Sequence, residues 1–157
     1  MEALREADEV ITVVISETQA AFEPKILVFS TNNISDPGID LAGSSHLHYS
    51  PRVVTIAVPC SSGISSSLIE YALKRGFDGV FLAADGDECA YLSDCSERTA
   101  NHVADAQKWM AMHGFQPERL RMAAICSVCA EPFVNYMHEF SRTLTALGPA
   151  GGESHGL

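Results

Sequence analysis

Four short apolar runs, each followed by a polar loop and a helical pattern, constrain this chain more than any other feature of its sequence. The runs cover residues 25–31, 53–58, 80–84 and 120–125. Continuous apolar content over so few residues is typical of strands that are buried on both faces. Helical patterns follow at residues 37–42, 65–76, 96–113 and 130–147. This alternation predicts an α/β fold with a four-stranded parallel sheet and helices on both faces, a flavodoxin-like or Rossmann-like three-layer sandwich.

The order of the strands can also be predicted. In a short doubly wound sheet the first strand usually lies centrally, the second and third lie on either side of it, and the fourth lies beside the third. Ligands of such sheets bind beyond the carboxyl ends of the strands. We therefore expect the functional residues in the loops that follow the four apolar runs.

The sequence outside this alternation divides the chain into three parts. Residues 1–23 form an N-terminal helical extension, because apolar residues recur there at a spacing of three and four before Pro24 ends the pattern. This helix either packs on its own domain or docks onto a partner subunit. Residues 24–147 form the α/β domain. Residues 148–157 are rich in glycine, which predicts a flexible tail.

Charge and targeting signals exclude several classes of partner. The chain carries 20 acidic and 10 basic residues, a net charge of −10, which disfavours binding to nucleic acid or to an anionic membrane. The N-terminus is acidic, and the apolar run Val10–Ile15 is too short to span a bilayer. We therefore expect a cytoplasmic protein without membrane insertion. No glycine-rich nucleotide-binding pattern is present in the sequence.

Five cysteines provide the chemistry. Cys60, Cys89 and Cys126 each follow the carboxyl end of a predicted strand, and Cys126 forms a Cys-x-x-Cys pair with Cys129. That pair precedes a helix, whose N-terminus favours thiolates. Four thiolates suit zinc or an iron–sulfur cluster, and the spacing also allows a dithiol that exchanges with disulfides. We predict Cys60, Cys89, Cys126 and Cys129 as ligands, with Cys95 as a substitute ligand.

The functional prediction follows from the cysteines, because no convincing pair of nucleophile and base accompanies them. The pattern favours a non-catalytic electron carrier over an enzyme. Ser61, Ser62 and Ser127 are the candidate hydrogen-bond donors to the ligand sulfurs. The alternative is a non-redox adaptor subunit in which a Cys₄ zinc site stiffens the fold.

Several short motifs between residues 24 and 140 together indicate a family. They are Asp40-Leu41-Ala42-Gly43, Ser45-x-Leu47-x-Tyr49-x-Pro51, Cys60-Ser61, Gly76-x-Asp78-Gly79-Val80, Cys89-x-Tyr91 and Pro117-Glu118-Arg119-Leu120-Arg121. In these motifs the chain resembles the hydrogenase iron–sulfur subunit family, the delta subunit of the methyl-viologen-reducing (F420-non-reducing) hydrogenase.

The resemblance implies a [2Fe–2S] protein that transfers electrons within a larger redox complex of anaerobic metabolism. Its partner would be a flavin- and iron–sulfur-containing, heterodisulfide-reductase A-like subunit, in a complex that can be electron-bifurcating.

The chain also departs from the family pattern. Family members carry a Cys-x-x-Cys at the positions of Thr31 and Ile34, and a further cysteine near Asp85. Only Cys60 and Cys89 match family cysteines. The resemblance therefore leads us to expect that the missing pair is replaced by the one after the fourth strand.

Overall fold

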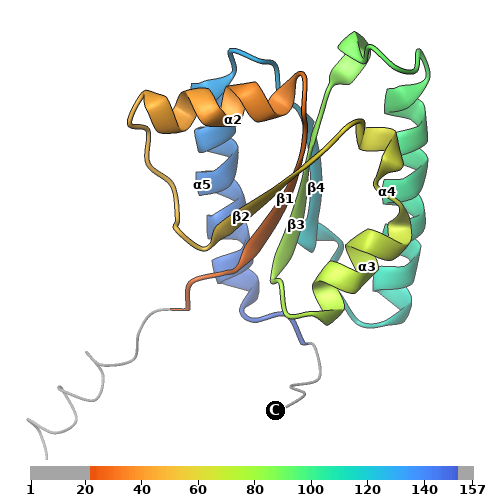
Figure 1. Ribbon diagram of the computed structural model, residues 1–157. Coiled ribbons are helices and arrows are strands. Elements are labelled where there is room, and N and C mark those ends of the chain that lie inside the picture. The colour runs from red at the N-terminus through yellow and green to blue at the C-terminus, as the bar shows by residue number, and fades with distance from the viewer. Residues whose placement is uncertain (1–21, 152–157) are drawn as a thin grey trace, which may run out of the picture.

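The computed structural model describes residues 22–151, and these form a parallel four-stranded sheet between two layers of helices (Figure 1). The strands are β1 (Ile26–Thr31), β2 (Val53–Val58), β3 (Gly79–Ala84) and β4 (Leu120–Ala124). Their order is β2-β1-β3-β4, with parallel pairing throughout. The predicted fold class and strand order are confirmed. The predicted N-terminal helix falls almost wholly on residues 1–21, which lie outside the described residues.

Within residues 22–151, four α-helices cover the sheet, two on each face (Figure 1). They are α2 (Ser35–Ser44), α3 (Ser66–Lys74), α4 (Cys95–Met112) and α5 (Ala130–Leu147). Single 3₁₀ turns also occur at η1 (Ser61–Gly63), η2 (Gly86–Glu88) and η3 (Pro117–Arg119). Helix α2 is longer than predicted, because Pro37 lies in its first turn, where the missing N–H costs little. In this described part of the chain, none of the helices combines the length and apolar character that crossing a bilayer requires.

The connections between strands place the helices on opposite faces, and this arrangement creates a hydrophobic core on each side of the sheet. Helices α2 and α5 pack over one face around Phe81, Phe133 and Phe140. Helices α3 and α4 pack over the other face around Leu73 and Met110. Strands β1 and β3 are buried along their whole length, as continuous apolar runs require. The loops from β2 and β3 therefore lead to one face, and those from β1 and β4 lead to the other.

A buried polar network ties the end of the domain to the amino end of the sheet. The fully buried guanidinium of Arg119 donates hydrogen bonds to the carbonyl oxygens of Asp78 (3.0 Å) and Gly148 (2.9 Å). The Asp78 carboxylate accepts hydrogen bonds from the N–H groups of Lys25 (2.8 Å) and Ala150 (3.0 Å). The first residues of the predicted flexible tail are thus held against the domain. Residues 152–157 lie outside the described part of the chain.

Two glycines of α2 provide a matched test of packing against the loop after β4. A Cβ atom on Gly38 would overlap the backbone oxygen of Cys126, whereas one on Gly43 would have no neighbour within 4 Å. We expect Gly38→Ala to lower the free energy of unfolding by about 1–3 kcal/mol, because a backbone oxygen cannot rotate away as a side chain does. Gly43→Ala should raise it by about 0.5–1 kcal/mol through helix propensity. Urea denaturation measures both values, and equal stability of the two variants would contradict this packing.

Candidate metal centre

Three cysteine thiols meet beyond the carboxyl ends of β2 and β3. The Sγ atom of Cys60 lies 3.4 Å from that of Cys89 and 3.0 Å from that of Cys95. All three Sγ atoms lie within 4.8 Å of one another. Cys60 follows β2, Cys89 follows η2 in the loop after β3, and Cys95 is the first residue of α4. We call these residues the Cys60–Cys89–Cys95 triad.

Hydrogen bonds fix the loop after β2 against the start of α4. The buried hydroxyl of Ser61 lies 3.0 Å from Thr99 Oγ1 and 3.3 Å from Cys95 Sγ. Thr99 in turn donates its hydroxyl hydrogen to the carbonyl oxygen of Cys95 (2.8 Å). On the other side of the triad, Ser62 Oγ lies 3.1 Å from Cys60 Sγ. The serines predicted as donors at 61 and 62 therefore both contact triad sulfurs.

The thiols of Cys60 and Cys95 differ in acidity because they share hydrogen bonds. Burial raises the pKa of Cys60, and its hydrogen bond with Cys95 raises it further, to about 11. Burial also acts to raise the pKa of Cys95, but hydrogen bonds from Cys60, Ser61 and the Ser62 backbone lower it to about 7. Cys95 therefore ionises before Cys60, and thiolates are the form that binds metals.

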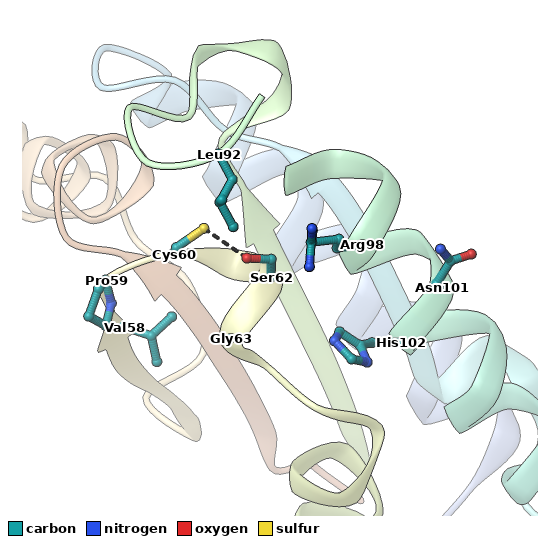
Figure 2. A pocket seen from close by; sticks show the side chains of 9 residues that line it. All are labelled: Val58, Pro59, Cys60, Ser62, Gly63, Leu92, Arg98, Asn101 and His102. Atoms are coloured by element: carbon teal, nitrogen blue, oxygen red, sulfur yellow. Dashed lines mark hydrogen bonds between the residues drawn. The ribbon is translucent and has the colours of Figure 1, made fainter. Parts of the chain in front are cut away.

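An open pocket of about 650 Å³ adjoins the triad (Figure 2). It is lined by the loop from Val58 to Gly63, and Leu92 projects into it from the loop before α4. Arg98 and His102, one turn apart on α4, line it from the helix side. Cys60 is the one member of the triad in the lining and is half-buried. The sulfur centre is therefore reached from solvent through Cys60.

The predicted ligand set is only partly brought together. Cys60 and Cys89 meet as expected, but Cys126 and Cys129 form a disulfide with each other. Their loop precedes α5 and packs on the face covered by α2, whereas the triad lies on the face of α3 and α4. Cys95, predicted as a substitute, completes the triad instead. The sequence pattern predicts that the loops share one edge of the sheet but does not assign them to faces.

Polar residues occupy the positions that the resemblance assigned to missing family cysteines. Thr31 donates its hydroxyl hydrogen to a carboxylate oxygen of Asp85, and both residues are buried. Ser35 Oγ accepts the N–H of Thr31 (2.7 Å) and donates to the carbonyl oxygen of Ala83 (2.8 Å). The carboxyl ends of β1 and β3 are thus joined by hydrogen bonds. The sequence signal for this network was the run of polar residues directly after each apolar strand.

The chain was compared with known proteins. The family model for the methyl-viologen-reducing hydrogenase delta subunit matches residues 26–148. The iron-sulfur subunit of the F420-non-reducing hydrogenase of Archaeoglobus profundus is 31% identical, over 82% of this chain and 93% of that protein. The vhc iron-sulfur subunit of the F420-non-reducing hydrogenase of Methanococcus voltae is 30% identical, over 82% of this chain and 89% of that protein.

A second type of relative is much longer than this chain. The A-type subunit of the ferredoxin:CoB-CoM heterodisulfide reductase of Methanosarcina mazei is 34% identical over 83% of this chain, but the match spans only 16% of that protein. Related sequence therefore occurs both as a protein of this length and as a segment of a larger one. On the family match and these identities, the chain belongs to the family of the methyl-viologen-reducing hydrogenase delta subunit.

Proposed function

We propose that this chain is an electron-transfer subunit of a larger redox complex and holds an iron–sulfur cluster at the Cys60–Cys89–Cys95 triad. The observation that carries the proposal is the convergence of three thiols within 4.8 Å at the carboxyl edge of the sheet. Relatives of similar length are named iron–sulfur subunits, which supports the choice of metal. No substrate is assigned to the chain itself.

The triad fits the demands of a thiolate metal site. Sulfur ligands of one tetrahedral ion lie about 3.8 Å apart when the metal–sulfur bonds are about 2.3 Å long. The Cys60–Cys89 and Cys60–Cys95 separations of 3.4 and 3.0 Å are close to this value, so small rotations of the side chains suffice for binding. A bound cluster would supply one-electron chemistry. Ser61 and Ser62 would donate hydrogen bonds to its sulfur ligands, an interaction that tunes the reduction potential.

Three thiolates are one fewer than the four that a [2Fe–2S] cluster takes. We propose that the pocket beside Cys60 admits the remaining ligand when the partner subunit docks. The set predicted from the sequence offers Cys126 and Cys129 as alternative ligands. That set requires their disulfide to be reduced and their loop to move from the α2 face towards the triad.

The proposed partner is a flavin-bearing, heterodisulfide-reductase A-like subunit, in a cytoplasmic, electron-bifurcating complex. Support comes from the relative in Methanosarcina mazei, in which a matching segment forms part of such a protein. A segment joined covalently to its redox partner in one protein occupies a natural docking position in another.

Metal analysis of the full chain tests the proposal. Purified without oxygen, the protein should be coloured and should contain iron and acid-labile sulfide in equal amounts, about two of each per chain for a [2Fe–2S] cluster. Reduction by dithionite should bleach the visible absorbance and produce an electron paramagnetic resonance signal. Colourless protein loaded with zinc would overturn the proposal and support the structural-zinc adaptor instead.

A further inference from the structure

The Cys126–Cys129 disulfide lies outside the site described above. It joins two residues three apart in sequence, between the end of β4 and the start of α5. Its loop reaches the face of α2 and α5, and Cys129 packs against the hydrophobic core of that face. The triad lies on the opposite face. The domain thus carries two separate groups of cysteine sulfur atoms.

The disulfide contributes little to holding this loop in place. A bridge that closes so short a loop removes little conformational freedom from the unfolded chain. The same turn is already closed by a backbone hydrogen bond from the N–H of Cys129 to the oxygen of Cys126 (3.0 Å). On its strand side, the N–H of Ile125 donates to the oxygen of Ala84 (3.0 Å). The loop can therefore keep its backbone conformation whether the sulfurs are bonded or reduced.

The loop is covered on one side and open on the other. Gly38 of α2 comes so close that a Cβ atom there would overlap the oxygen of Cys126. Between the cysteines, Ser127 is exposed and Val128 has 75% of its surface exposed. Cys126 and Cys129 are themselves half-buried. A thiol on another protein can therefore approach the disulfide from the side of Ser127 and Val128.

The two sulfur atoms are not equivalent, because only one lies at a helix end. Cys129 is the N-cap residue of the 18-residue helix α5, and its side chain makes no capping hydrogen bond. The unpaired N–H groups and partial positive charge of a helix N-terminus stabilise a thiolate there. Attack on a disulfide is fastest when it releases the better leaving group, which makes Cys126 the sulfur attacked and Cys129 the sulfur released.

We propose that Cys126 and Cys129 form a reversible two-electron dithiol/disulfide site, distinct from the triad, that exchanges with a protein dithiol. A thiolate of that dithiol attacks Cys126 Sγ, forming a mixed disulfide and releasing Cys129 as a thiolate. The second thiol of the partner then attacks its own sulfur in the mixed disulfide and releases Cys126. Two electrons and two protons pass to the pair, and the partner leaves as a disulfide.

Differential alkylation of the full chain tests the site. Anaerobically purified protein is incubated with either reduced or oxidised dithiothreitol and then desalted. Accessible thiols are alkylated with N-ethylmaleimide under native conditions, and the peptide containing residues 126–129 is weighed by mass spectrometry. We expect two alkyl groups after the reduced incubation and none after the oxidised one. The same sample cycled between the two should switch each time, with its metal content unchanged.

Single variants test which sulfur is attacked. After reduction and exposure to oxidised glutathione, Cys129→Ser should retain glutathione on Cys126, because no neighbouring thiol can release it. Cys126→Ser should retain several-fold less on Cys129. Two results would overturn the proposal. In one, the disulfide is reduced only after unfolding in urea, which makes it structural. In the other, the two thiols resist alkylation until a chelator removes the metal, which makes them ligands.

Discussion

The Cys95→Ser variant is expected to lose its bound iron and visible absorbance when purified without oxygen. Cys95 Sγ lies 3.0 Å from Cys60 Sγ, its side chain is buried, and its pKa is lowered to about 7 by hydrogen bonds within the site. Serine at this position keeps the shape but replaces a soft thiolate with a hydroxyl that is far harder to ionise. Loss of a supporting residue already costs about 10–100-fold in metal affinity, so loss of a direct ligand should exceed that. Iron analysis and the visible spectrum measure the effect.

The matched control is the double variant Cys126→Ser, Cys129→Ser. Its cysteines lie on the other face of the sheet, so its iron content and spectrum should match those of the unaltered chain. Far-ultraviolet circular dichroism checks that both variants are folded. The opposite pattern, with iron retained in Cys95→Ser and lost in the double variant, would restore the ligand set predicted from the sequence.

Arg119→Met is expected to lower the free energy of unfolding by about 3–5 kcal/mol, the range for breaking a buried polar pairing from one side. Methionine preserves much of the apolar volume but removes every hydrogen bond of the guanidinium. The carbonyl oxygens of Asp78 and Gly148 would lose their donor in a buried setting. The stability of a domain is only about 5–15 kcal/mol, so the loss is a large share of the total.

Arg121→Met serves as the control because it changes the same residue type two positions along. Arg121 pairs with Glu139 at 3.1 Å across a solvent-exposed surface. Such pairs contribute about 0–1 kcal/mol. Guanidinium chloride denaturation of the metal-free chain measures both variants without the contribution of bound metal. Similar midpoints for the two variants would contradict a structural role for the buried arginine.

The family motifs contain both kinds of residue, and the structure separates them. Asp78 and Arg119 come from two different motifs and meet at the amino end of the sheet, where they hold residues 148–150. Cys60 and Cys89 come from two others and meet at the carboxyl end. The first pair accounts for stability, and the second pair accounts for the proposed chemistry. The motifs alone did not distinguish these roles.

The fold was predictable because its signals are local. Residues 26–31 and 79–84 form strands that are buried along their whole length, and their runs of apolar residues are what a strand covered on both faces requires. Helix boundaries followed from Pro37 in a first turn and from glycines beyond helix ends. Parallel order then followed from right-handed crossovers, which leave few topologies for four strands.

The arrangement of the cysteines was decided by the tertiary structure. The sequence alone brings Cys60, Cys89 and Cys126 to one edge of the sheet, since each follows a strand. It does not establish that the loops from β2 and β3 turn to one face while the loop from β4 turns to the other. That choice depends on which face each helix covers, a long-range property of packing. It is why Cys95, at the start of α4, joins Cys60 and Cys89 in the triad, and why Cys126 and Cys129 bond to each other instead.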